Sequence, residues 1–129
     1  MCIRDRLLGE GAGGGALALL PADRVVAAQH GWVAPLPPEG ASEILYRTVE
    51  RAPELAAAQG VRSADLAAAG IVDRIVPERP DAAEELREFL SRLSVALEYE
   101  LTFLIHQDKA ERLAARHQRY RNLGLHPKS

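Results

Sequence analysis

Cysteine is nearly absent from this sequence, and so are long hydrophobic runs. The chain has 129 residues and one Cys, at position 2, which excludes an internal disulfide and a zinc ribbon. No apolar run approaches the roughly 20 residues that a membrane-crossing helix needs. The opening hexapeptide MCIRDR is charged and lacks the apolar region of a signal peptide. We therefore expect a protein of the reducing cytoplasm.

The chain also lacks a large excess of either sign of charge, with a net charge of −2. Such a balance argues against a dedicated nucleic-acid-binding protein. The charge is uneven, since residues 1–108 hold 10 Lys/Arg and 17 Asp/Glu, whereas residues 109–129 hold six and one. A run of this kind is most often a solvated helix face or a surface that docks on an acidic partner, and less often an RNA or phosphate site. The residues concerned are Arg112, Arg116, Arg119, Tyr120 and Arg121.

Glycine, in contrast, is concentrated in one place. The stretch GEGAGGGALALL, residues 9–20, holds five of the ten glycines within its first seven positions. Consecutive glycines at the start of a helix present unpaired backbone N–H groups and no Cβ atoms. They can therefore stabilise a carbonyl oxygen that gains negative charge during a reaction. A turn that only lets a helix pack tightly is the alternative without chemistry.

The same glycines formally satisfy the dinucleotide-binding pattern, but the context of that pattern is poor. The pattern needs a preceding strand, of which only Leu7 and Leu8 remain, and an acidic residue about 20 positions later, whereas Asp23 comes much sooner. No Lys-Ser/Thr pair follows the glycines, which excludes a P-loop. We rank nucleotide binding below the oxyanion interpretation.

The remaining pattern predicts short strands and helices in mixed order. Strands are expected at 23–28, 31–36 and 71–77, and helices at 14–20, 38–50, 52–59 and 63–69. On the helix that begins at Pro38, we expect Ile44 and Leu45 to face inward. We expect Ser63 to cap the last of these helices and Gly70 to end it.

A longer helical region follows Pro80. Asp81 and Glu84 form a plausible capping box that would open a long helix. Asp108 and Glu111 repeat this start signal for a final basic helix. The apolar stripe of the long helix needs the chain's own core or a second subunit to cover it. Its members are Leu86, Leu90, Leu93, Leu97, Leu101 and Leu104.

The order of these motifs resembles a known family. GEGAGGGALALLPADRVVAAQHGWVAPLPPEGASEILYR, followed by AAAQGVRSADLAAAGIVDRIVPE, is similar to the carboxyltransferase component of biotin-dependent acetyl-CoA carboxylase. The similarity is to the alpha half, as found in actinomycete-type chains that fuse a beta and an alpha half. It runs over residues 7–80 and more loosely to 124, through the tail RHQRYRNLG.

The resemblance implies an α/β crotonase-like (ClpP/crotonase) fold of strand–strand–helix turns with a helical C-terminal extension. Residues 7–80 would be part of the carboxyltransferase core and residues 81–129 the extension. Residues 1–6 look like a non-native assembly scar at the broken end of a longer chain. We therefore expect a C-terminal fragment that is inactive alone.

The resemblance also implies an activity, namely transfer of CO2 from carboxybiotin on a biotin carrier protein to acetyl-CoA or another acyl-CoA. The product of acetyl-CoA would be malonyl-CoA for fatty-acid biosynthesis. The implied partners are a beta-like half of the same chain, a homodimer partner, the carrier protein and biotin carboxylase, with no nucleic acid and no membrane. Other crotonase-fold acyl-CoA enzymes, such as a hydratase or decarboxylase, and a non-catalytic assembly module remain alternatives.

Site residues are carried over by motif. Gly14 and Gly15 would be the backbone oxyanion donors to the ureido oxygen of biotin, and Gly11 and Gly13 would shape their loop. The resemblance places Pro38, Glu39 and Gly40 in biotin or substrate binding, and no metal is implied.

Several further residues have structural interpretations. Ala12 stands where many family members have glycine, which is acceptable only if its backbone angles are ordinary. Glu39 is expected to complement a helix dipole rather than act as an acid or base, and Trp32 to lie in the core or in the wall of the biotin cleft. The histidines lack metal-ligand spacing, so surface or packing roles are expected. They are His30, His106, His117 and His126.

Overall fold

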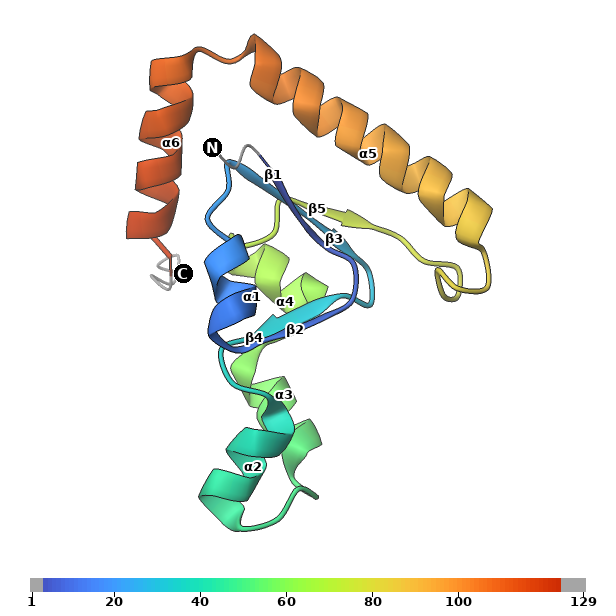
Figure 1. The fold of residues 1–129 in the computed structure, drawn as a ribbon, viewed down its shortest axis with the longest axis vertical. Helices are drawn as coiled ribbons and strands as arrows, with labels where there is room; N and C mark the ends of the chain where they lie inside the picture. Colours follow the sequence, from blue (N-terminus) through green and yellow to red (C-terminus); the bar gives the residue numbers. More distant parts are fainter. Residues whose placement is uncertain (1–3, 124–129) are drawn as a thin grey trace.

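A computed structural model describes residues 4–123 of the chain. The elements in chain order are β1 (Arg4–Leu7), β2 (Glu10–Ala12), α1 (Gly13–Leu19), β3 (Arg24–Ala28), β4 (Trp32–Ala34), α2 (Pro38–Tyr46), α3 (Ala52–Gln59), α4 (Ser63–Ala68), β5 (Arg74–Val76), α5 (Leu86–His106) and α6 (Lys109–Arg121). The strands occupy the middle of the molecule, α5 and α6 lie on one side of them, and α2 and α3 form the opposite end (Figure 1).

The chain repeats one structural unit. Each unit places a strand in a first sheet, a strand in a second sheet and then a helix: β1, β2 and α1 form one unit, and β3, β4 and α2 begin the next. The first sheet has the order β1-β3-β5 and the second pairs β2 with β4, all in parallel. Parallel pairing requires a crossover between units, which the helices supply. This is the strand–strand–helix turn that the family resemblance implied.

A strand does precede the glycine run, which the sequence pattern did not indicate. Arg4–Leu7 forms β1 and pairs with β3, with Leu7 opposite Ala27. Strand pairing is a backbone interaction, so a segment can form it without the apolar pattern of a buried strand. That residues 1–6 are non-native stays a prediction, and residues 1–3 lie outside the described part of the chain.

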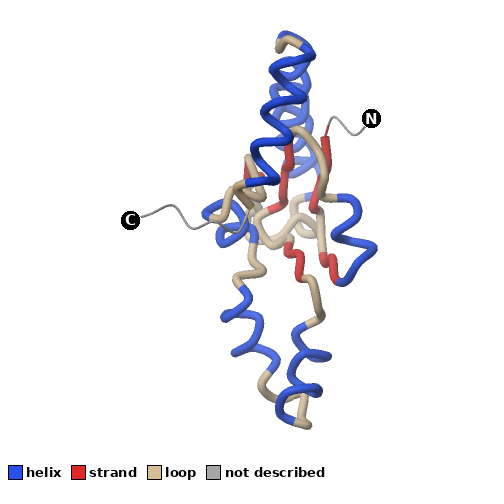
Figure 2. The backbone as a smooth tube through the Cα atoms, turned by 90° about the vertical axis from the view of Figure 1, so that its left-hand side faces the viewer, coloured by secondary structure: helices blue, strands red, loops and turns tan. Residues whose placement is uncertain are grey.

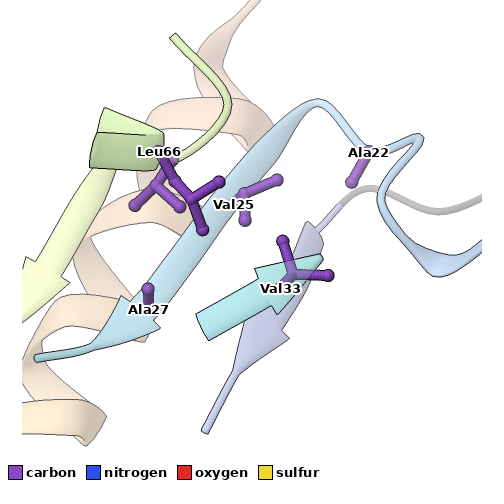
Figure 3. Close-up of a cluster of buried hydrophobic side chains, with 6 residues drawn as sticks. Ala22, Val25, Ala27, Val33 and Leu66 are labelled. Atoms are coloured by element: carbon purple, nitrogen blue, oxygen red, sulfur yellow. The ribbon is translucent and has the colours of Figure 1, made fainter. Parts of the chain in front are cut away.

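The core forms on both faces of β3. Successive side chains of a strand point to opposite faces, so Val25 and Ala27 enter one hydrophobic cluster and Val26 and Ala28 another. The first cluster, between the two sheets and α4, adds Ala22, Val33, Leu66 and Val72 (Figure 3). The second, under α5, adds Val76, Phe89, Leu93 and Ala96. Full burial of each valine contributes about 1.5–3 kcal/mol, so β3 is the centre around which both sides pack.

The long helix buries a different stripe from the predicted one. Leu93 and Leu104 are buried as expected, but Leu86 and Leu90 are 59% and 50% exposed. The buried face instead contains Phe89, Leu93, Ala96, Glu100 and Leu104. Glu100, which bonds to arginines of the sheet, lies on this same face, and Phe89 is buried where Leu86 and Leu90 are exposed.

The start of this helix was also predicted wrongly. α5 begins at Leu86, five residues after Asp81. Asp81 Oδ1 accepts a hydrogen bond from the N–H of Ala83, and the N–H of Glu84 donates to the carbonyl of Asp81. These bonds close a separate turn before the helix. Glu85, which follows, is the N-cap residue of α5 but makes no side-chain capping bond.

The predicted cap of the last helix is confirmed. Asp108 accepts hydrogen bonds from the N–H groups of Ala110 (2.8 Å) and Glu111 (3.1 Å). α6 then runs back toward α1, so that Tyr120 near its end meets the residues that follow α1 (Figure 1).

The basic residues of α6 dock on the chain's own acidic groups, which corrects the expectation of a solvated or partner-binding face. Arg116 binds Asp23 with both ends of its guanidinium, at 2.7 and 2.6 Å. Arg119 binds Asp73 at 2.7 Å. The Tyr120 hydroxyl accepts from the N–H of Ala22 at 2.9 Å and lies 2.7 Å from the carbonyl of Leu20, to which it donates. The partner surface is therefore the end of the chain's own first sheet, where β3 and β5 begin.

Glu100 ties α5 to the same sheet. Its two carboxylate oxygens accept hydrogen bonds from Nε of Arg24 and Nε of Arg74, each at 2.7 Å, and its side chain is fully buried. Burial by itself raises the pKa of this carboxyl group, but the hydrogen bonds from the two arginines prevail and hold the pKa below its usual value. Glu100 is therefore a buried anion between two cations.

α2 and α3 form a helical hairpin that projects from the sheets (Figures 1 and 2). Ala41 and Ser42 are buried, and the Ser42 hydroxyl donates to the carbonyl of Thr48 at 2.5 Å. Ile44 and Leu45, predicted to face inward, are 68% and 63% exposed. Small residues face inward instead, and the larger apolar ones are left outside.

Two shorter elements also differ from the prediction. The N-cap of α4 is Arg62 rather than Ser63, whose hydroxyl donates to the carbonyl of Gln29 at 2.5 Å. β5 covers only residues 74–76, and the N–H groups of Ile71 and Val72, predicted to belong to this strand, instead donate to the carbonyl of Leu66 in α4. In residues 4–123 no helix combines the length and apolar character needed to cross a membrane.

Candidate functional site

The fold brings the glycine run and the Pro38 segment to one edge of the second sheet. β2 and β4 pair in parallel, with Ala12 opposite Ala34. α1 begins directly after Ala12, and α2 begins four residues after Ala34. Because the carboxyl ends of parallel strands lie at the same edge, both helix starts emerge there.

The amides of Gly14 and Gly15 lie in the first turn of α1. The helix begins at Gly13, so these N–H groups have no acceptor in a preceding helical turn. Among residues 4–123, neither amide donates a backbone hydrogen bond outside the helix. A Cβ atom built at either position meets nothing within 4 Å, and both residues are exposed. The two donors are therefore open to an approaching oxygen atom.

The flanking residues explain how the loop holds this shape. Gly13 has φ +76°, a conformation that side chains disfavour. A Cβ atom at Gly11 would lie 3.3 Å from Cβ of Ala16 and 3.4 Å from Cγ2 of Val33, so glycine permits the close approach of helix and strand. Ala12 has φ −141° and ψ 150°, ordinary extended angles that any residue adopts. The departure from glycine at position 12 therefore costs nothing.

A cavity of about 470 Å³ lies where β4 begins, between the sheet and the α2–α3 hairpin. Its walls are largely apolar and include Trp32, Pro38, Pro53, Ala56 and Val61. Its charged or titratable lining residues are Glu10, His30, Glu39 and Arg62. Trp32 thus lines a cavity, and its predicted place in a biotin cleft stays a prediction.

The structure joins only some of the predicted site residues in this cavity. Pro38 and Glu39 line it, whereas the glycines of the α1 loop and Gly40 do not. Glu39 lies in the first turn of α2, where a carboxylate complements the helix dipole. The glycine loop and the cavity are therefore two separate features, since the loop follows the carboxyl end of β2 whereas the cavity lies where β2 and β4 begin.

Arg62 supplies a cation to the cavity. It binds Asp65 through Nε at 2.9 Å. The hydrogen bond between them raises the pKa of Arg62 and lowers the pKa of Asp65. Both groups therefore stay ionised near neutral pH.

One contact near the cavity was missed by sequence reasoning. His30 follows β3, and its Nδ1 lies 3.4 Å from Oε2 of Glu78, in the loop after β5. His30, His106 and His117 are exposed, as expected for surface residues, and His126 lies outside the described residues. No short-range spacing could have revealed the pair, since 48 positions separate its members.

The fold and the glycine-edged site together define an α/β protein of the crotonase-like class. Residues 3–124 match the model of the family "Acetyl co-enzyme A carboxylase carboxyltransferase-like", and the chain belongs to this family.

Two kinds of curated relatives match nearly the whole chain. One is named a probable biotin-dependent acyl-coenzyme A carboxylase beta3 subunit, from Mycobacterium tuberculosis, and is 64% identical over 119 residues, which are 92% of this chain and 24% of the relative. The other is named the alpha subunit of acetyl-coenzyme A carboxylase carboxyl transferase, from Sphingopyxis alaskensis, and is 40% identical over 92% of this chain and 38% of the relative. The chain thus spans about a quarter of the mycobacterial relative's length.

A solved structure has the same fold. It is a Pseudomonas malonate decarboxylase hetero-tetramer in complex with coenzyme A, with a TM-score of 0.61 and 24% sequence identity. The similarity covers 92% of this chain and 48% of the other.

Proposed function

We propose that this chain is part of the carboxyltransferase of a biotin-dependent acyl-CoA carboxylase, in the alpha-like half. The observation that carries the proposal is the pair of open amides at Gly14 and Gly15 in the first turn of α1. Family membership supports the same conclusion, because it covers residues 3–124.

The two amides act as an oxyanion site. Carboxybiotin, carried on a biotin carrier protein, supplies the CO2 group. Gly14 and Gly15 donate their N–H groups to the ureido oxygen, which gains negative charge as CO2 leaves, and the positive end of the α1 dipole adds to this stabilisation. Donors already in place require no rearrangement during the reaction. No side chain needs to change its protonation state in this half of the reaction.

The surrounding residues border the place proposed for the biotin ring system. Gly11 and Gly13 hold the loop in the conformation described above. Pro38, Glu39 and Gly40 begin α2 at the same edge, and the first two also line the apolar cavity. We assign these three residues to binding of biotin or substrate.

The acceptor in this proposal is an acyl-CoA. Acetyl-CoA, with malonyl-CoA as the product for fatty-acid synthesis, is the proposed substrate. The alpha-subunit relatives named for acetyl-coenzyme A carboxylase support this choice. The proposed partners are a beta-like half of the same chain, which would hold the enolate, a second copy of the chain, the biotin carrier protein and biotin carboxylase. The proposed location is the cytoplasm.

Gly14→Val tests the proposal in a full-length carboxyltransferase that contains this segment. Valine adds a branched side chain next to the amides, and its Cβ atom makes no clash, since a Cβ atom there meets nothing within 4 Å. We expect a 10²–10³-fold loss of carboxyl transfer, equal to about 2.7–4 kcal/mol of transition-state stabilisation.

Gly9→Val is the matched control. Gly9 precedes β2, at its end away from α1, and its Cβ position is equally open. The control should keep its activity. If Gly14→Val is as active as Gly9→Val, the oxyanion assignment is wrong and an assembly role would account for the segment better.

A further inference from the structure

His30, Glu78 and Asp81 meet beside the cavity, although they come from two separate connections. His30 lies in the turn between β3 and β4, and the two acids lie in the connection from β5 to α5. One potential ligand atom from each residue lies within 4.8 Å of the others. The fold therefore gathers one imidazole nitrogen and two carboxylate oxygens at one point.

The distance within this cluster suits two ligands of one metal ion better than a direct ion pair. Nδ1 of His30 lies 3.4 Å from Oε2 of Glu78. A charge-assisted hydrogen bond would be about 2.7–2.9 Å long. Two ligands at about 2.0–2.1 Å from a tetrahedral zinc ion lie roughly 3.4 Å apart. We infer that these three residues form a binding site for a divalent transition-metal ion of the zinc class.

Backbone amides hold both carboxylates in place for this role. Glu78 accepts from the N–H of His30 at 2.7 Å through Oε2 and from the N–H of Ala82 at 2.9 Å through Oε1. Asp81 accepts from the N–H of Ala83 at 2.8 Å through Oδ1. Outer hydrogen bonds of this kind orient metal ligands. The Glu78 side chain is only 6% exposed, so its position is well defined.

The donor set favours zinc or cobalt over harder cations. Calcium takes six to eight oxygen ligands, whereas three protein ligands of the His and carboxylate type suit zinc and leave a fourth position for water. A bound ion would join the β3–β4 turn to the connection that leads into α5. This site does not depend on the proposed carboxyl transfer, because none of its ligands belongs to the glycine loop.

Cobalt(II) titration of the 129-residue chain tests the inference, with calorimetry and visible absorption as readouts. We expect one ion per chain, with the absorption of four-coordinate cobalt and displacement by zinc. His30→Gln and Asp81→Asn should each weaken binding at least 100-fold. Both variants keep the local hydrogen bonds, since His30 contacts Glu78 through its backbone N–H and asparagine retains Oδ1.

His106→Gln is the control, because His106 is also exposed and, among the described residues, its side chain bonds to the carbonyl of Thr102. It should bind cobalt as the unchanged chain does, and circular dichroism should show that all variants are folded. Equal affinity in the unchanged chain and in His30→Gln would overturn the inference. So would the absence of cobalt binding by the unchanged chain, which would leave a plain contact between His30 and Glu78.

Discussion

The α5–α6 side of the molecule and the α2–α3 hairpin use charge in opposite ways. On the first side, ion pairs join residues far apart in sequence, such as Arg24 with Glu100 and Arg116 with Asp23, and the acidic partners are buried. In the hairpin, Arg51 pairs with Glu54 three positions away, with side chains 45% and 64% exposed. The first arrangement joins separate elements of the tertiary structure. The second is an exposed pair within one helix and contributes little to stability.

This difference explains the uneven charge of the chain. The basic C-terminal helix needs no nucleic acid or outside partner to account for it, because Arg116 and Arg119 meet Asp23 and Asp73 of the same chain. The end with the candidate site, in contrast, keeps the open amides of Gly14 and Gly15. These amides remain available for a ligand, whereas Arg116 and Arg119 already bind acidic groups of the same chain. Both regions expose apolar side chains, such as Ile44 in α2 and Ile105 in α5.

Glu100→Ala should have the largest effect on stability. The change removes a fully buried carboxylate and leaves Arg24 and Arg74 without their common anion. We expect a loss of about 3–5 kcal/mol in the free energy of unfolding, measured by urea titration at pH 7. Glu98→Ala, an exposed neighbour on α5, is the control and should change little.

The Glu100 contribution should also depend on pH in a defined direction. Its pKa is lower in the folded chain than the ordinary value of 4.5. The stabilisation is therefore fully present above that value and is lost as pH falls through the folded-state pKa. The gap between the unchanged chain and Glu100→Ala should narrow in acid, and a gap as wide at pH 2 as at pH 7 would contradict the ion-pair explanation.

Tyr120→Phe should have an intermediate effect. The hydroxyl accepts from the N–H of the fully buried Ala22, and its loss leaves that donor unsatisfied. We expect about 1–3 kcal/mol of destabilisation by the same urea measurement. Tyr99→Phe is the matched control, since Tyr99 is 58% exposed and its ring contact with Arg74 would remain. Equal effects of the two changes would mean that α6 is not anchored by this hydroxyl.

Glu54→Ala should have the smallest effect. It breaks the exposed pair with Arg51 in α3 and leaves a good helix-forming residue. We expect the urea midpoint to stay within experimental error. A loss of stability as large as that of Tyr120→Phe would mean that the exposed pair of the hairpin matters as much as the long-range contacts of α6.

Local features were the ones that could be predicted. The extents of α1 and α3, the cap at Asp108 and the ordinary angles of Ala12 follow from residue types and short spacings. The inward face of α2 and the start of α5 could not be predicted in this way. The first depends on how α2 packs against α3. The second depends on a local turn that Asp81 closes with Ala83 and Glu84, and for which the capping-box pattern was mistaken.

The same distinction between local and tertiary features applies to the candidate site. The sequence by itself determined that a glycine-started helix would present bare amides, because glycine lacks a Cβ atom and the first turn of any helix lacks acceptors. Only the tertiary structure decided which charges would meet, including Arg116 with Asp23 and His30 with Glu78. Backbone conformation depends on neighbours a few residues away, whereas contacts across 93 or 48 positions depend on how β3 and its partners pack.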